Sequence, residues 1–300
     1  MNRNNKKILS WAFYDWANSV YSTTVMAGFF PIFFEKYWSN PDDVIQSTFQ
    51  LGLANSIASI IVALLSPFLG AIADRGSLRK KFLFTFAFLG ICMTGCLFLL
   101  NKGEWRLAIF IYVAASVGFM CGNIFYDSIL PSIAKKDKID FVSSLGYSLG
   151  YLGGGLLFLI NVLMYLNPEW FGIQNQAMAI KISFITVAIW WGIFSLPMLI
   201  FIPEEKIADS VPLNQALIAG FIQLKSTFNQ IRKMKTIGIF LMAYWLYIDG
   251  VDTIIKMAVK MGSSIGFETS DLITALLMVQ FIAFPAALFY SWFSKKIGVK

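Results

Sequence analysis

Long apolar runs alternate with short polar connections along the whole chain. Eight runs are long enough to cross a membrane as helices, since about 20 mainly apolar residues at a rise of about 1.5 Å each span the hydrocarbon core. They cover residues 8–30, 50–73, 82–100, 107–130, 142–166, 179–202, 237–261 and 270–294. The first run lacks a small-x-small cleavage site, so we expect it to remain as a helix rather than to be removed as a signal peptide.

The longest polar connection follows the sixth run and divides the chain. Inside it, apolar residues recur at steps of three and four and predict an amphipathic helix: Leu213, Leu217, Phe221, Leu224, Phe228 and Ile231. Such a helix lies along the inner membrane surface or packs on the cytoplasmic loops, and the pattern leaves both open. We therefore expect an N-terminal six-helix half (1–202), a cytoplasmic linker (203–236) and the start of a C-terminal half (237–300).

The composition is typical of a membrane protein. Hydrophobic residues make up 57% of the 300 positions, charged residues only 14%, and the mean hydropathy is +0.67. In soluble domains about a quarter of the residues are charged. The sequence thus predicts an all-α membrane protein whose main surroundings are the lipid bilayer.

The distribution of basic residues predicts the orientation. With the N-terminus in the cytoplasm, the cytoplasmic segments hold 18 of the 24 Lys and Arg residues, and the opposite segments hold 6. This bias is the positive-inside pattern. The net charge of +7 therefore requires no nucleic acid as a partner, and we expect a multi-pass protein of the cell membrane.

The absence of histidine excludes several kinds of catalytic site. Without it there is no H-E-x-x-H zinc site, no histidine proton relay and no Ser–His pair, and the sequence has no Walker A loop. Asp249-Gly250 lacks the G-x-G-D surround of aspartyl membrane proteases. The three cysteines lie in predicted spans and are interpreted as small apolar filler: Cys92, Cys96 and Cys121. We expect no enzyme, no metal and no cofactor.

An internal repeat relates the first and seventh predicted helices. W-A-F-Y-D-W-A-N-S (11–19) and W-L-Y-I-D-G-V-D-T (245–253) align at an offset of 234 residues. A second echo relates residues 70–80 to residues 290–300. Two echoes in the same order are typical of a transporter with two parallel halves. Six helices per half predict twelve, so we expect the chain, which stops after eight at Lys300, to be truncated.

The motif G-x-x-x-D-R-G-x-x-R-K connects the second and third predicted helices. Its glycine permits the close approach of a neighbouring helix, and its acid sits among cations that can hold one conformation and release another. The alternative is a basic turn that only sets topology. We refer to the motif as the latch loop, with the residues Gly70, Asp74, Arg75, Arg79 and Lys80.

The latch loop resembles the signature of the major facilitator superfamily. Further motifs resemble its vacuole-effluxer-like branch: Y-D-W-A-N-S (14–19), F-F-P (29–31), F-Y-D-S-I-L-P-S-I-A (125–134), S-S-L-G-Y-S-L-G-Y-L-G-G-G (143–155) and Y-I-D-G-V-D-T-I (247–254). The resemblance implies a major facilitator fold with twelve helices, alternating access without ATP and, for some members, amino-acid efflux. The second copy of the loop departs from the motif at Tyr290, Ser294 and Lys295.

Acidic residues lie inside two of the apolar runs. A charge at the bilayer centre costs at least ~2.5–3.5 kcal/mol, so we expect each acid to face a wet cavity or a partner. At helical spacing, two stripes form: Asp15, Asn18, Ser19 and Ser22 on the first helix, and Asp249, Asp252, Thr253 and Lys256 on the seventh. The resemblance implies that the stripes line a central cavity and face each other. An acid there takes up a proton or binds an ammonium group, although Lys256 also has the spacing to pair with Asp252.

Two further features concern conformation and packing. Asp127 lies near the cytoplasmic end of the fourth predicted helix, where a conformational role is favoured over substrate contact. Gly146, Gly150 and Gly154 form a smooth helix face for either sliding or static contact.

Together these features predict a secondary transporter for a small polar solute, with an amino acid as one candidate and protons as a candidate coupling ion. The alternative is a non-transporting or inactive membrane protein that needs a partner chain.

Overall fold

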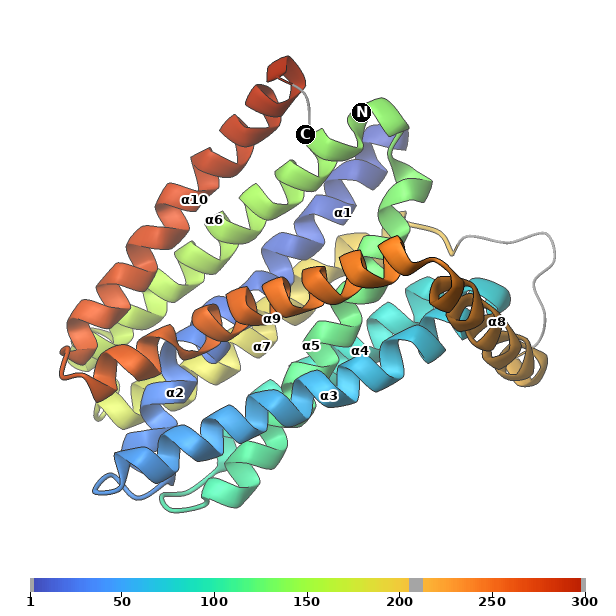
Figure 1. Ribbon diagram of the computed structural model, residues 1–300. Coiled ribbons are helices and arrows are strands. Elements are labelled where there is room, and N and C mark those ends of the chain that lie inside the picture. Colours follow the sequence, from blue (N-terminus) through green and yellow to red (C-terminus); the bar gives the residue numbers. More distant parts are fainter. Residues whose placement is uncertain (1–2, 205–212, 298–300) are drawn as a thin grey trace.

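The computed structural model describes residues 3–204 and 213–297, and these residues form helices without any strand (Figure 1). The helices after the first are α3 (Val44–Gly76), α4 (Arg79–Cys96), α5 (Trp105–Ile133), α6 (Ile139–Leu166), α7 (Gln176–Phe201), α8 (Leu213–Lys233), α9 (Lys235–Ser264) and α10 (Thr269–Ile297). Short 3-10 turns lie at Leu97–Leu99, Lys136–Lys138 and Pro168–Phe171.

Seven helices in the described part of the chain are long and apolar enough to cross a membrane: Val44–Asp74, Arg79–Leu99, Trp105–Ile133, Lys136–Leu166, Gln176–Phe201, Lys235–Ser264 and Thr269–Phe293. They coincide with the second to eighth apolar runs. Their first residues lie one to six positions before the predicted limits, and their last residues lie between one position before and three positions after them.

The first apolar run is not among these seven, because its helix is divided into segments of different geometry. It runs through α1 (Arg3–Val20), the π-helical η1 (Tyr21–Phe29), α2 (Phe30–Phe33) and the π-helical η2 (Phe34–Trp38). π-Helical geometry is rare and is frequent at functional sites. Almost every side chain from residue 20 to residue 35 is buried, so this helix forms the centre of the packed bundle.

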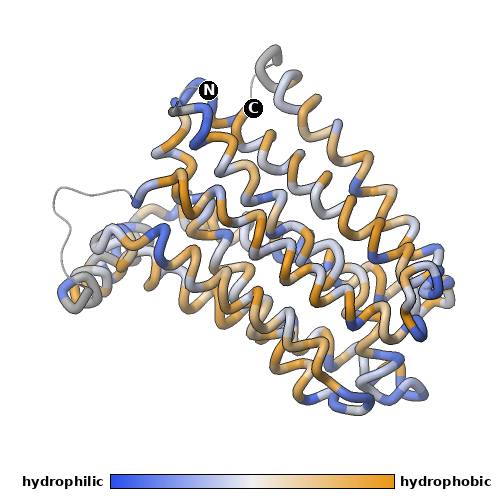
Figure 2. The backbone as a smooth tube through the Cα atoms, turned by 180° about the vertical axis from the view of Figure 1, so that it is seen from behind, coloured by the Kyte–Doolittle hydropathy of each residue, from blue (hydrophilic) through white to orange (hydrophobic). Residues whose placement is uncertain are grey.

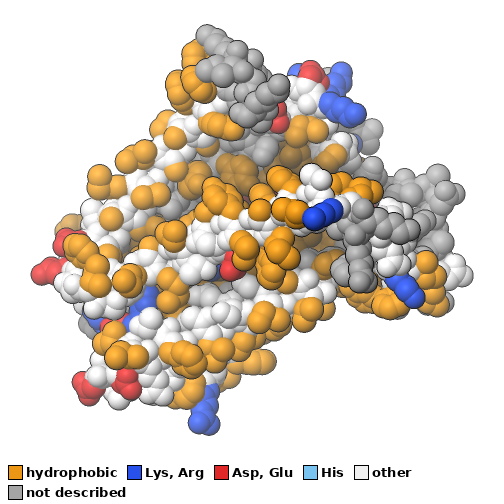
Figure 3. Space-filling model, in the orientation of Figure 1, with side chains coloured by type: hydrophobic (Ala, Val, Ile, Leu, Met, Phe, Trp, Pro, Cys, Tyr) orange, Lys and Arg blue, Asp and Glu red, His pale blue; other side chains and the backbone are white. Residues whose placement is uncertain are grey.

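The two ends of the bundle are polar, and the middle is apolar (Figure 2). The N-terminus, the end of α10 and the linker helix α8 lie toward one end, which we name the proximal side (Figure 1). The connections after η2, α4, α6 and α9 lie on the other, which we name the distal side. Hydrophobic side chains are spread over the face between the two ends, among backbone and other side chains (Figure 3).

Small residues allow the closest helix contact in the first half. α4 and α5 cross where Gly90 and Gly118 meet, and a Cβ atom built on Gly118 would lie 2.8 Å from the Cα atom of Gly90 and 2.7 Å from the carbonyl oxygen of Phe86. No side chain fits in that space. Backbone contact of this kind is how membrane helices associate where no hydrophobic effect drives them together.

The predicted amphipathic helix corresponds to α8, which packs on the proximal end of α3. A Cβ atom on Gly220 would lie 3.1 Å from the backbone nitrogen of Ile72. Phe221 is exposed and Leu224 is half-buried; the side chains of Leu213, Leu217, Phe228 and Ile231 lie outside the described part. The linker helix therefore contacts the helix that carries the latch loop.

Replacing Gly118 by alanine should lower the free energy of unfolding by about 1–3 kcal/mol, because the added methyl group forces α4 and α5 apart. Equilibrium unfolding of the full chain in mixed detergent micelles measures this change. Gly95→Ala on α4 is the matched control, since its Cβ atom would meet Ala188 at an ordinary 3.7 Å. Equal stability of the two variants would contradict the proposed backbone contact.

Candidate functional site

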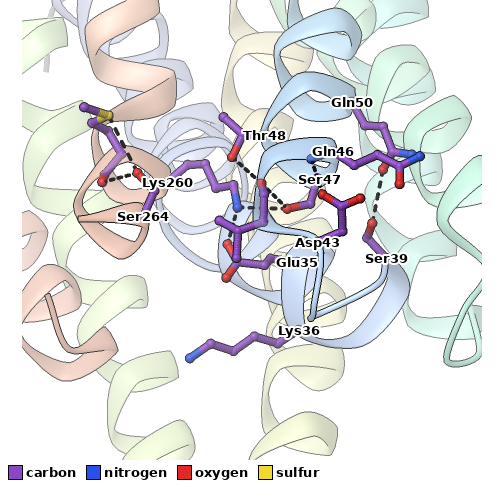
Figure 4. Close-up of polar contacts among 12 residues, drawn as sticks. Glu35, Lys36, Ser39, Asp43, Gln46, Ser47, Thr48, Gln50, Lys260 and Ser264 are labelled. Atoms are coloured by element: carbon purple, nitrogen blue, oxygen red, sulfur yellow. Dashed lines mark hydrogen bonds and ion pairs between the residues drawn. The ribbon is translucent and has the colours of Figure 1, made fainter. Parts of the chain in front are cut away.

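A buried ion pair joins the two predicted halves on the distal side. The Nζ atom of Lys260, on α9, donates to the Oε2 atom of Glu35, in η2, and to the Oγ atom of Ser47, on α3, at 3.0 Å. The side chain of Lys260 is 1% exposed and that of Glu35 is 9% exposed. We name Glu35, Ser47 and Lys260 the distal cluster (Figure 4).

Local backbone structure positions the two residues of the first half. Glu35 lies near the distal end of the first helix, where η2 ends at Trp38. α3 begins shortly afterwards, and Asp43 caps it by accepting from the backbone N–H of Gln46 at 2.9 Å. Ser47 stands in the first turn and donates to the carbonyl oxygen of Val44 at 2.9 Å. Its oxygen is thereby left to accept from Lys260.

Two weaker polar contacts also connect the halves on this side. The exposed Lys36 donates to the Oγ1 atom of Thr269, on α10, at 3.0 Å; Figure 4 shows that Lys36 points away from the distal cluster. Asn55, on α3, donates to the Sδ atom of Met257, on α9, at 3.6 Å. Met257 precedes Lys260 by three residues, so the two side chains lie on the same face of α9.

In the distal cluster, the ammonium group of Lys260 and the carboxylate of Glu35 neutralise each other, which allows both to be buried. Burying an isolated ammonium or carboxylate costs several kcal/mol, and removing one partner of a buried pair typically costs ~3–5 kcal/mol. The Ser47 hydroxyl supplies a further acceptor for the ammonium group. Lys260 therefore remains buried only while α9 and the first half stay in contact.

A cavity of about 450 Å³ lies on the proximal side between α6 and α10. Its polar lining consists of one carboxyl group and five hydroxyl groups, from Asp140, Ser143, Ser144, Tyr147, Tyr151 and Tyr290. In Figure 3 the surface is hollowed between α9 and the α6–α10 pair. None of the eight residues predicted to line a central cavity is among the lining residues of this one.

The polar stripe of the first helix packs against neighbouring helices. Asp15 accepts from the Ser19 hydroxyl at 3.0 Å, and a Cβ atom on Gly150, on α6, would lie 3.0 Å from the Oδ1 atom of Asp15. Asn18 is buried and donates to Asn123, on α5. The Ser22 hydroxyl donates to the carbonyl oxygen of Ser19 at 2.9 Å.

The glycine face of α6 receives this first helix. Cβ atoms on Gly146, Gly150 and Gly154 would lie 2.8 Å from Trp11, 2.6 Å from Ser19 and 2.7 Å from Thr23, respectively. The three glycines therefore allow the two helices to approach along three successive turns.

The corresponding stripe on α9 has different surroundings. Asp249 and Thr253 are exposed, whereas Asp252 and Lys256 are half-buried and form an intrahelical ion pair at 3.6 Å. α9 packs chiefly on η1 and α2. The buried residues of α9 lie in its distal part, at Val259, Lys260 and Gly262, whereas the predicted acids lie near the middle of the helix.

The latch loop is held by contacts within the first half. Arg79 pairs with Asp74 at 2.9 Å and donates to the carbonyl oxygen of Ser128, on α5, at 3.3 Å. The Nζ atom of Lys80 donates to the carbonyl oxygen of Leu199 at 2.7 Å, and the Glu204 carboxylate accepts from the backbone N–H groups of Lys80 and Lys81 at 2.9 and 3.1 Å. These contacts tie the start of α4 to α5 and to the end of α7.

The remaining residues predicted to act in conformational change are Gly70, Arg75 and Asp127, together with the second copy of the latch loop. No atom of a neighbouring helix lies within 4 Å of a Cβ atom built on Gly70 among the described residues, so the close approach that this glycine permits stays a prediction. Asp127 is exposed near the proximal end of α5. The side chains of Arg75, Ser294 and Lys295 lie outside the described part.

The distal cluster was not predicted from the sequence, although the position of Lys260 indicates a buried partner. Lys260 falls inside the seventh apolar run, and the residue four positions before it is Lys256, not an acid. An intramembrane lysine without a partner on its own helix requires one elsewhere. Hydrophobic periodicity does not reveal that this partner is Glu35.

Comparisons with known proteins identify a family of membrane transporters to which the chain is similar. The family model for vacuole effluxer Atg22-like proteins matches residues 3–300. An uncharacterized MFS-type transporter, YxiO of Bacillus subtilis, is 34% identical over 303 residues, which cover 100% of this chain and 70% of that protein. An uncharacterized protein of Aquifex aeolicus is 28% identical, covering 71% of this chain and 50% of its own length. Autophagy-related protein 22 of Yarrowia lipolytica is 21% identical, with coverages of 62% and 44%.

The aligned region is therefore more than two thirds of the length of the Bacillus protein and half or less of the other two. No solved structure matches the chain. The family match extends over nearly every residue, and the helices that it covers have membrane-spanning length and composition. This chain belongs to the family of vacuole effluxer Atg22-like proteins.

Proposed function

We propose that this protein is a secondary active transporter that moves a small polar solute across a membrane by alternating access. The observation that carries the proposal is the unequal contact between its halves. On the distal side, α9 is joined to the first half through the distal cluster. On the proximal side, a cavity lies between α6 and α10.

The boundary between α6 and α10 fits the same interpretation. Beside the cavity, the Ser148 hydroxyl on α6 donates to the carbonyl oxygen of Phe284 on α10 at 3.1 Å, so the two halves remain in contact there. A cavity on one side and a buried polar contact on the other correspond to one end state of a transporter whose halves rock about a central site.

The proximal side is the cytoplasmic side in this proposal. The described parts of the segments that hold 18 of the 24 basic residues lie on that side, in agreement with the positive-inside pattern. The protein then has a cytoplasmic N-terminus in the cell membrane, and the observed state opens inward.

The polar groups at the open side favour a neutral or positively charged solute. The cavity presents hydroxyl groups and the Asp140 carboxyl group, with no Lys or Arg among its lining residues. Asp15 adds an acidic group within the bundle, and Asp249 adds an exposed one on α9. An amino acid binds such a lining through its ammonium group, and outward release fits the effluxer description of the family.

Asp15 is the candidate for proton coupling. Its carboxylate accepts from the Ser19 hydroxyl, and no ion pair of Asp15 occurs among the described residues. A carboxylate surrounded by apolar helices without a cation is stabilised when it takes up a proton. Opening to either side in turn would then let it load and release that proton.

Asp15→Asn should abolish flux driven by a pH gradient, with a loss of at least about tenfold, because the amide cannot exchange a proton at neutral pH. Vesicles containing the full-length protein and a mixture of labelled amino acids provide the measurement. Asp137→Asn, in the exposed turn before α6, is the matched control and should keep parental flux. Unchanged flux in Asp15→Asn would remove this residue from the coupling mechanism.

The orientation predicts which loops react from outside. In a variant without the three native cysteines, Lys135→Cys on the proximal side should react with a membrane-impermeant thiol reagent only after cells are permeabilised. Lys102→Cys on the distal side should react in intact cells. The reverse pattern would place the N-terminus outside.

A further inference from the structure

We propose that the ion pair between Lys260 and Glu35, seated on Ser47, is the lock that holds the outer face of the transporter closed. This inference rests on the proposed function and assigns it a gate. In the outward-open state the pair must be broken and both charges hydrated; in the state seen here it is formed and buried.

The first argument is that the pair crosses the boundary between the two halves. Glu35 and Ser47 belong to the first half, and Lys260 belongs to α9 of the second. Ion pairs within one half, such as Asp74–Arg79, and within one helix, such as Asp252–Lys256, are unaffected when the halves move apart. The buried Lys260–Glu35 pair depends directly on that movement.

The second argument is burial. The Lys260 side chain is 1% exposed, so its attraction to Glu35 acts in a medium of low polarity and is screened little by water or salt. The neighbouring contact between Lys36 and Thr269 also crosses between the halves but is exposed, and exposed polar contacts contribute little. The two adjacent residues Glu35 and Lys36 therefore provide a matched comparison.

The third argument is geometry around the pair. Ser47 is held in the first turn of α3 by its bond to Val44, so the acceptor for Lys260 is already oriented. Met257, one turn before Lys260, packs on Asn55. Separation of the halves on this side would thus expose the Met257 position together with Lys260.

The test measures how often the outer face opens. Met257→Cys is introduced into the full chain without its three native cysteines, and a membrane-impermeant thiol reagent is added from the distal side of sealed cells. In the Glu35→Gln/Lys260→Met double variant, we expect labelling to become faster by about 5- to 150-fold, the usual range of coupling between two states. Both charges are removed in this variant, so no unpaired buried charge remains to prevent folding.

Two further variants separate the buried pair from other contacts. The exchanged double variant Glu35→Lys/Lys260→Glu restores a pair and should return to slow labelling. Lys36→Gln should label within about twofold of the parent, as expected for an exposed contact. Thermal unfolding in detergent checks that each variant is folded.

Three results would overturn the proposal: unchanged labelling in the neutral double variant, fast labelling in the exchanged variant, or equal acceleration by Lys36→Gln. The labelling needs no substrate, so it is independent of the proposed transport. A lock that responds as expected without detectable flux would contradict the transport proposal alone. Flux that persists with unchanged labelling would contradict the lock alone.

Discussion

The requirement that charges be neutralised in a medium of low polarity determines how the second half meets the first. Lys260 cannot remain in the apolar interior by itself, since hydration is absent there and the cost is several kcal/mol. Glu35 and Ser47 meet this requirement from two separate elements, η2 and α3. Their positions depend in turn on the distal end of the first helix and on the cap of α3 by Asp43. A single buried ammonium group thus connects three helical elements, η2, α3 and α9.

Within the first half, close backbone packing holds the helices together without buried charges. The glycines of α6 let α1 and η1 approach without intervening side chains, and Gly90 and Gly118 do the same for α4 and α5. Contacts of this kind involve no charge that favours separation. The first half is therefore expected to move as one body, whereas its boundary with α9 depends on a few polar groups that water can satisfy equally well when the halves part.

The helices could be predicted from the sequence because membrane insertion is a local property. Apolar length alone identified the seven spans α3 to α7, α9 and α10, and the three-and-four periodicity that begins at Leu213 predicted the amphipathic helix α8. The π-helical geometry of Tyr21–Phe29 was not predictable in this way, since a change from α to π geometry depends on how the buried helix packs. The truncation and the division into halves remain predictions.

The site was harder to predict from the sequence, because the hydrogen-bond partner of each polar side chain is decided only in the folded chain. Asp15, Asn18 and Ser19 share one stripe by spacing, yet Asn18 bonds to α5 while Asp15 and Ser19 lie against Gly150 on α6. Neighbouring helices, not the spacing, decide this division. Gly70 shows the same limit: a small residue permits close contact but does not supply a neighbour.

The internal repeat indicates how the two halves differ in chemistry. Asp15 and Asp249 occupy aligned positions, and so do Asn18 and Asp252. In the first half the acid is packed beside Ser19 and the amide bonds to Asn123. In the second, Asp249 is exposed and Asp252 is neutralised by Lys256. Where the first half has the amide Asn18, the second has the acid Asp252 and, one turn later, the cation Lys256. Asn18 is satisfied by a residue of another helix, and Asp252 by a residue of its own. Asp15 is therefore a packed carboxylate without an ion pair among the described residues, whereas Asp249 is exposed and Asp252 has Lys256 beside it. Protonation of Asp15 removes an uncompensated charge from the packed interior, whereas protonation of Asp252 would leave the charge of Lys256 uncompensated.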